Sequence, residues 1–183
     1  MLNLFTKLDE TIKNPSLEYG FARTKSGRIV KLERDENNHL KIPEDIQKEG
    51  REKGLHTLIH NHPQGTSPLA SPEDIRSFAE YGSKYGISKN ELGTFRVKNN
   101  NGPQNKEISE QIEEEVSKVK KRIKKDFNQH LKDKGIDWRE YKKQNNKRYK
   151  KECLEFTNEN IEKYVPWYQE TLNKYGMEVI FIK

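Results

Sequence analysis

The sequence predicts an α/β protein whose sheet is interrupted by a helical segment before its last strand. Over residues 1–105, short β-prone runs alternate with short helical stretches, separated by turns rich in Gly, Pro and Asn. Residues 106–175 then show helical periodicity, and the chain ends in MEVIFIK, which is strongly β-prone. A strand in that position is expected to return to the sheet begun before residue 100.

The elements expected in the first half follow from periodicity and from turn residues. Leu4, Leu8 and Ile12 recur at helical spacing, Pro43 favours a helix start, and Gly54 favours a helix end. In order, the chain predicts a helix over residues 3–14, a hairpin over 17–33, a polar loop at 35–38, a helix over 43–54, a strand over 55–62, a loop over 63–70, a helix from 71 to about 85, and a strand over 91–98.

The second half predicts three helices. Apolar residues from Ile108 to Leu131 recur at spacings of three or four, which predicts one long amphipathic helix ending near Gly135. Two further helices are expected over about 137–156 and 158–175. Pro166 should kink the last helix or start a new one, because proline cannot donate a helical hydrogen bond.

Composition favours a globular protein with a small core. Hydrophobic residues make up 31% of the chain and charged residues 35%, so part of it should form exposed, charged helices or need a partner. The single cysteine, Cys153, excludes an internal disulfide and suits a reducing compartment. No apolar run approaches a membrane span, and the N-terminus lacks the features of a signal peptide. We therefore expect a soluble, cytoplasmic protein without a membrane partner.

The positive charge is concentrated in one segment. Residues 118–151 contain fifteen Lys or Arg against four Asp or Glu, whereas the whole chain carries a formal charge of +6. Such a basic helical segment is compatible with a solvated surface, with an acidic protein partner or with nucleic acid bound through its phosphates.

Residues 59–75, IHNHPQGTSPLASPEDI, carry the chemistry. His60 and His62 are two apart at the end of a predicted strand, so both imidazoles point to one face. A helix that opens at Ser71 can bring Asp74 back as a third ligand. Three protein ligands with one open position describe a catalytic zinc site rather than a structural one.

The order HNHP then S-x-x-D resembles the signature of the JAB/MPN metalloproteases, the JAMM motif, and also RadC-like proteins and domains attached to phage minor head proteins and bacterial toxins. The resemblance covers residues 55–80 closely and 15–100 loosely. It implies a curved mixed sheet flanked by helices, with zinc bound by His60, His62 and Asp74. It also implies that Ser71 steadies the oxyanion and that an upstream glutamate, Glu18 or less closely Glu33, is the general base.

Each of these residues also has a structural interpretation. Ser71 and Asp74 match a helix-capping box, with Pro72 at the first helical position. Glu18 could be an ordinary surface residue of a strand. His56 shares the strand face of His60 and could contact a metal-binding residue without binding the metal itself. Cys153 is expected to pack in a helix. His39 and His130 receive no role.

The expected organisation is a metal-binding domain of the JAB/MPN type over residues 1–105, a basic helical elaboration over 106–175, and a final strand over 176–183. The leading functional hypothesis is a zinc-dependent peptidase or isopeptidase acting on a peptide or protein. Two alternatives remain: a non-catalytic binding or morphogenesis module encoded by a phage or mobile element, and a RadC-like protein that processes nucleic acid.

Overall fold

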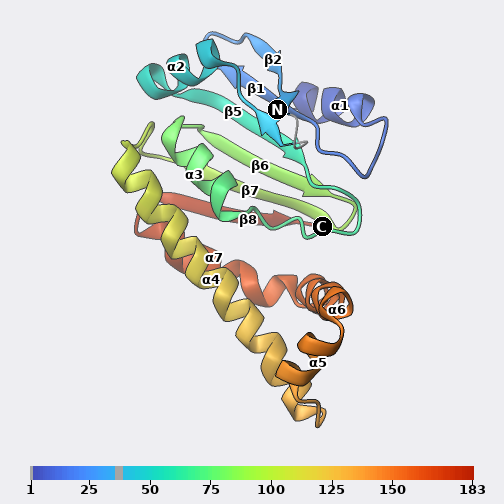
Figure 1. Cartoon of the computed structure of the whole chain (residues 1–183). Helices are drawn as coiled ribbons and strands as arrows, with labels where there is room; N and C mark the ends of the chain where they lie inside the picture. The colour runs from blue at the N-terminus through green and yellow to red at the C-terminus, as the bar shows by residue number, and fades with distance from the viewer. Residues whose placement is uncertain (1, 36–38) are drawn as a thin grey trace.

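The computed structural model describes residues 2–35 and 39–183. Its centre is a six-stranded mixed sheet with helices on both faces, so the predicted α/β class is confirmed (Figure 1). The strands lie in the order β2-β1-β5-β6-β7-β8, and a separate ribbon pairs β3 with β4. Their bounds are Gly20–Thr24 (β1), Ile29–Lys31 (β2), Glu33–Arg34 (β3), Leu40–Lys41 (β4), Leu55–Asn61 (β5), Tyr85–Asn90 (β6), Gly93–Asn99 (β7) and Met177–Ile182 (β8).

One pair of strands in the six-stranded sheet is parallel. β5 and β6 run in the same direction, and the other neighbouring strands are antiparallel. Parallel neighbours need a crossover, which here consists of residues 62–84 and contains the helix α3 (Pro72–Glu80). The HNHP and S-x-x-D motifs therefore lie together at the carboxyl end of β5, between the strand and the start of α3.

The two faces of the sheet are covered by different helices. α1 (Leu2–Thr11) packs Leu4 and Leu8 against Phe21 and Ile59 on one face. The opposite face packs against α2 (Glu44–Lys53), α3, α4 (Lys106–Asp133) and α7 (Ile161–Asn173). In β5, Leu58 and His60 point to this second face, because they alternate with Ile59.

The first half of the chain follows the expected order, but the strand β6 and the short ribbon of β3 and β4 were not predicted. The hairpin forms from β1 and β2, and α2 ends at Gly54 as predicted. Of the expected polar loop, residues 36–38 lie outside the described residues. The helix expected from 71 to about 85 was wrong at its end, because α3 stops at Glu80 and residues 85–90 form the strand β6.

The strand β6 was not predicted because the residues on one of its faces are small or polar. Gly86 and Ser88 alternate with Tyr85 and Ile87, so the segment lacks the apolar run typical of a central strand. Gly86 is required by packing, since a Cβ there would lie 2.2 Å from the ring of Phe78 on α3. The same glycine that allows α3 to pack closely on the sheet also weakens the β signal.

The helical segment contains four helices, not the predicted three. The expected helix over 137–156 is divided into α5 (Trp138–Gln144) and α6 (Asn146–Glu159). Asn145 separates them in a non-helical conformation, and its side chain accepts a hydrogen bond from the backbone N–H of Arg148. No new helix begins at Pro166, which lies inside α7.

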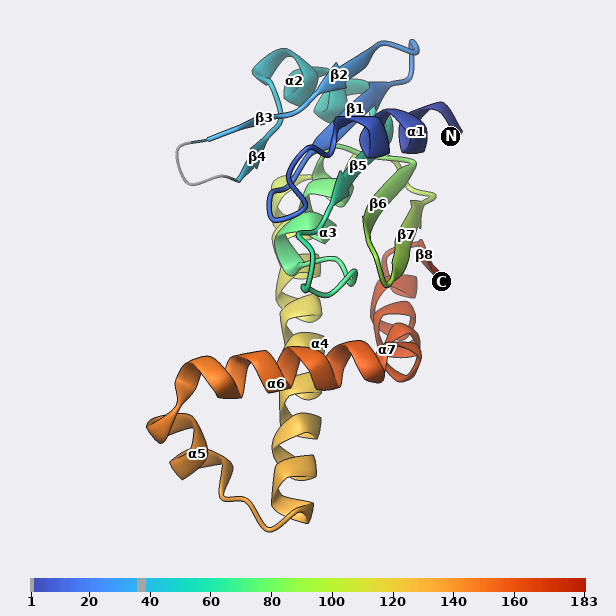
Figure 2. The same ribbon diagram turned by 90° about the vertical axis from the view of Figure 1, so that its right-hand side faces the viewer.

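The last strand joins the sheet as predicted. β8 pairs antiparallel with β7, so α4–α7 are inserted between two neighbouring strands. α4 extends beyond the sheet, and α6 crosses this outer part of α4 (Figure 2). The apolar stripe of α4 is continuous with the core under the sheet through Ile112, Val116 and Ile123. No helix in residues 2–35 and 39–183 has the length and apolar character to cross a membrane.

Candidate metal centre

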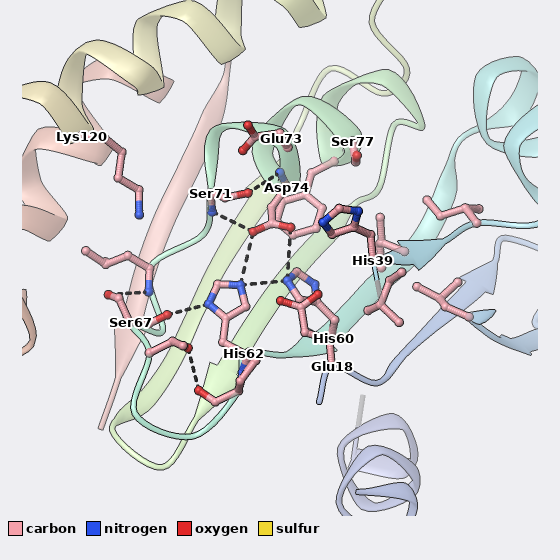
Figure 3. A pocket seen from close by; sticks show the side chains of 18 of the residues that line it. Glu18, His39, His60, His62, Ser67, Ser71, Glu73, Asp74, Ser77 and Lys120 are labelled. Carbon is pink, nitrogen blue, oxygen red and sulfur yellow. Dashed lines mark hydrogen bonds and ion pairs between the residues drawn. The ribbon is translucent and has the colours of Figure 1, made fainter. Parts of the chain in front are cut away.

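Three potential metal ligands meet at the carboxyl end of β5 (Figure 3). His60 lies in the strand, His62 follows it, and Asp74 lies in the first turn of α3. The Nε2 atom of His60 is 3.2 Å from Oδ1 of Asp74, and Nε2 of His62 is 3.3 Å from Oδ2. The two Nε2 atoms are 3.0 Å apart. Within the part of the chain that the structure describes, this is the one group of His, Cys, Asp or Glu with such spacing.

The donor set is suited to a zinc ion. Tetrahedral zinc with bonds of about 2.0–2.1 Å places neighbouring ligand atoms about 3.3 Å apart. Here the two Nε2 atoms are 3.0 Å apart, and each lies within 3.3 Å of one of the two Asp74 carboxylate oxygens. Two imidazole nitrogens and a carboxylate are also ligands that zinc commonly takes in catalytic sites. Because the chain supplies three ligands, a fourth position would be left for water or substrate.

A backbone contact determines the tautomer of His62. Its Nδ1 atom is 2.6 Å from the carbonyl oxygen of Ser67, and a carbonyl can only accept a hydrogen bond. Nδ1 therefore carries the proton, and the lone pair of Nε2 points toward His60 and Asp74. A second group that fixes the tautomer and ring orientation in this way is typical of metal-binding histidines.

The loop that supplies this carbonyl is held by β6 and α7. Ser88 Oγ donates a hydrogen bond of 2.8 Å to the carbonyl oxygen of Pro68, and Asn90 Nδ2 donates one of 2.7 Å to that of Thr66. From the helical segment, Tyr168 donates its hydroxyl to the carbonyl oxygen of Ala70 at 3.2 Å. Sequence reasoning missed all three donors, since none of them lies near the histidine motif in the chain.

Ser71 and Asp74 form the capping box that the sequence allowed. Ser71 Oγ accepts the N–H of Asp74 at 3.0 Å, and Asp74 Oδ2 accepts the N–H of Ser71 at 2.7 Å. The cap and the metal-ligand arrangement are compatible, because the cap holds the carboxylate in the orientation that faces the histidines. The Ser71 hydroxyl accepts in this cap, so its own proton is left to donate.

The buried His60 and half-buried Asp74 side chains shift each other's pKa. Burial lowers the pKa of His60, but the negative charge of Asp74, aided by Glu18, outweighs burial and raises it above the usual value. Burial raises the pKa of Asp74, but His60 and His62 outweigh it and hold that pKa well below the usual value. The Asp74 carboxylate is therefore ionised, as a metal ligand must be.

Glu18 lies beside the three candidate ligands, but it does not lie within a strand as predicted. It precedes β1, which begins at Gly20. Its side chain lines the same cavity as His60 and His62, and Figure 3 shows its carboxylate next to His60. Glu33, the weaker candidate, is exposed on β3 and is not among the cavity-lining residues.

Asn61, between the two histidines, positions the Glu18 segment. Its side chain points to the opposite face of β5, where Oδ1 accepts the N–H of Tyr19 at 2.6 Å and Nδ2 donates to the carbonyl oxygen of Leu17 at 3.0 Å. These two bonds bracket Glu18 on both sides. One stretch of three residues therefore supplies two candidate ligands and holds the candidate base.

The site opens into a cavity of about 850 Å³, within the range of small-ligand pockets. Leu32 and Leu40 line it from β2–β4 and their connections, and Lys120 and Leu154 line it from α4 and α6. The helical segment thus forms part of the wall. Lys120 is half-buried, and burial lowers its pKa, an effect that Asp74 and Glu73 partly oppose. Sequence reasoning had counted Lys120 only as one member of the basic segment.

The remaining histidines and the cysteine lie apart from the ligands. His56 contacts Thr57 and Tyr85 and does not line the cavity. His130 stacks on Phe156 in the helical segment, where Cys153 also packs. His39 is exposed but contributes to the cavity lining, a position that its sequence context did not indicate.

Comparison of the chain with protein-family models, with curated proteins and with solved structures finds no match. The likeness to the JAB/MPN family therefore depends on the motif of residues 55–80 and remains a prediction.

Proposed function

We propose that the protein is a zinc-dependent peptidase or isopeptidase of the JAB/MPN type. The observation that carries the proposal is the meeting of three metal-ligand atoms, within 4.8 Å of one another, with the carboxylate of Glu18 in a single cavity. A structural zinc site would be closed by a fourth protein ligand, whereas this group has three and opens into a space that can admit a substrate.

Each residue has a defined task in this proposal. A zinc ion held by His60, His62 and Asp74 would supply an acidified water and a Lewis acid for the scissile carbonyl. Glu18 accepts the proton of the attacking water and passes it to the leaving amine. Ser71 donates a hydrogen bond from its hydroxyl to the carbonyl oxygen as negative charge develops there. Asn61 keeps the Glu18 segment against β5 throughout.

Metal analysis of purified variants tests the ligands. Zinc is expected at about one ion per chain, and His62→Ala or Asp74→Ala should remove it, because two remaining ligands bind zinc weakly. His130→Ala is the matched control, since that imidazole packs against Phe156 far from the site along the helical segment. A His62→Ala protein with wild-type zinc content would contradict the proposal.

Hydrolysis assays test the general base. A panel of peptides, isopeptide-linked conjugates, DNA and RNA is incubated with the zinc-loaded protein, with and without a chelator. Glu18→Gln should reduce peptide or isopeptide hydrolysis at least about 100-fold and leave zinc content unchanged. Glu33→Gln should retain activity. If Glu33→Gln is the inactive variant, the base has been assigned to the wrong glutamate.

A second candidate is nucleic-acid binding or processing, which the exposed basic helices favour. Exposed Lys and Arg side chains from three helices lie in this region: Lys121, Arg122, Lys124, Lys125, Lys143, Lys147, Arg148, Lys150 and Lys151. Binding through phosphates would weaken steeply as salt rises. A binding constant that does not change with salt, or hydrolysis confined to peptides, would remove this candidate.

A further inference from the structure

We infer that Lys120 forms an anion-binding subsite in the cavity and selects substrates with a carboxylate near the scissile bond. This inference rests on the proposed peptidase function and adds the class of substrate. Lys120 comes from α4, in the inserted helical segment, and among the described residues it is the one Lys or Arg that lines the cavity.

The first argument is that the Lys120 ammonium group has no protein partner. Two nearby cations on α4 do have partners: Lys118 bonds Glu115, and the guanidinium of Arg122 lies 3.8 Å from the ring centre of Trp167. For Lys120, no hydrogen bond or ion pair occurs within residues 2–35 and 39–183. The ammonium nitrogen of the half-buried Lys120 remains accessible to solvent in the cavity, so it is free to bind an anion there.

The second argument concerns the position of Lys120 on its helix. It lies one residue after the buried Val119 and three before the buried Ile123, on the side of α4 that faces the protein. An apolar residue would suit that packing better than a lysine does. The flexible stem instead carries a positive charge into a cavity whose other ionisable side chains include Glu18, Glu73 and Asp74.

The third argument is the arrangement of the charged groups. In Figure 3, Lys120 and Glu18 lie on opposite sides of the group formed by His60, His62 and Asp74, and Lys120 is on the side of Ser71. If Glu18 returns the proton to the leaving amine, that amine lies on the Glu18 side. The substrate group that contacts Lys120 then lies on the acyl side of the scissile bond. A carboxylate there satisfies the ammonium group with a charge-assisted hydrogen bond.

The test compares binding of matched peptides to zinc-loaded protein. Hexapeptides carry Glu or Gln at the residue that donates the scissile carbonyl, and a third set carries its only carboxylate at the free C-terminus, with an amidated control. Dissociation constants are measured by calorimetry for the wild type, for Lys120→Met and for Lys121→Met. Lys121 is exposed on the same helix and provides the control.

Lys120→Met should weaken binding of the Glu peptide about tenfold or more and leave the Gln peptide unchanged. Lys121→Met should change neither, and Lys120→Glu should reverse the preference in favour of a Lys-containing peptide. A larger effect on the C-terminal set would contradict the acyl-side position of the subsite, because the free C-terminus lies on the side of the leaving amine. Equal losses for the Glu and Gln peptides would indicate a structural role and overturn the subsite, as would no detectable binding of any anionic peptide.

The two proposals fail in different ways. Zinc-dependent hydrolysis with no preference between Glu and Gln peptides would leave the peptidase in place and remove the role of Lys120. Selective binding of Glu peptides that depends on Lys120, without hydrolysis of any substrate, would keep the anion subsite and remove the enzyme. Zinc content and thermal melting of Lys120→Met show whether the fold and the metal site are intact.

Discussion

Asn61 connects the candidate ligands to the candidate base through its side-chain amide. The strand alternates His60 and His62 on one face with Asn61 on the other, so one short segment acts on both faces of the sheet. All three residues of the motif HNH therefore contribute to the candidate site, and the middle one does so through backbone groups of Leu17 and Tyr19.

Asn61→Ala removes both of these hydrogen bonds and should release the Glu18 segment from β5. We expect hydrolysis to fall about tenfold or more, because a catalytic group misplaced by an ångström loses much of its effect. Zinc content should remain, since the ligands are unchanged. The free energy of unfolding should fall by about 1–3 kcal/mol.

Asn99→Ala is the matched control for Asn61→Ala. Asn99 is also buried, and it holds a backbone turn through Gly102 and Asn101, away from the metal centre. It should lose similar stability and keep its hydrolytic rate per folded molecule. If both variants lose activity in proportion to stability, Asn61 has no specific effect on Glu18.

The His60–Asp74 pair predicts opposite pH dependence for the metal-free and zinc-loaded proteins. Because the folded-state pKa of His60 is raised above its unfolded value of about 6.5, its stabilising contribution is complete below that value and is lost as pH rises through the folded pKa. The depressed pKa of Asp74 gives stability above about pH 4 that is lost as pH falls through the folded pKa.

Urea unfolding between about pH 5 and 8.5 checks this prediction. With a chelator present, stability should fall toward alkaline pH, and His60→Gln should flatten that slope. With zinc present, stability should rise over the same range, because zinc binds deprotonated imidazole. Parallel curves with and without zinc would show that the metal does not bind these histidines.

Among the elements, β6 carries structural support that the sequence did not reveal. It pairs with β5, contacts α3 through Gly86, and holds the loop between β5 and α3 through Ser88 and Asn90.

Gly86→Ala would place a methyl group against the ring of Phe78 and should lower the free energy of unfolding by about 1–3 kcal/mol. The penalty should be smaller in a Phe78→Leu background, as a double-mutant cycle would measure. Equal penalties in both backgrounds would mean that Phe78 is not the obstacle.

Local signals were sufficient where ligands and caps are close together in the chain. Ser71 and Asp74 share one helix turn, and His62 directly follows the strand that contains His60, so periodicity and capping rules predicted their geometry. Ser88, Tyr168 and Lys120 act on the site from distant segments, and nothing in their own sequence context indicates those contacts. The break at Asn145 was missed for a related reason, since an Asn inside a polar helix is unremarkable until its side chain is seen to cap α6.

At the scale of the whole molecule, the site is shared between the sheet and the inserted helices. The candidate ligands lie on β5, on the loop after it and on α3, whereas Tyr168 and Lys120 reach the site from α7 and α4. The apolar core is likewise continuous from the sheet into α4 and α7. We therefore expect the metal to stabilise both parts together.

Zinc should raise the midpoint of thermal unfolding by roughly 5–10 °C at a free concentration about 100 times its dissociation constant. Both tryptophans, Trp138 and Trp167, lie in the inserted helices, so their fluorescence reports on that segment alone. The same shift should appear in fluorescence and in far-ultraviolet circular dichroism, and His62→Ala should abolish both. A fluorescence transition that zinc leaves unmoved would show that the helices melt independently of the site.

The insertion between β7 and β8 also sets an order of events during synthesis. The segment with the candidate metal ligands, residues 60–74, leaves the ribosome well before α4 and α7, and β7 must wait for residues 177–182 before it gains its second neighbour. Pairing over so long a separation is slow compared with forming local helices. If the proposed metal site is correct, the nascent chain has its three candidate ligands before the helices that complete the cavity wall have been made.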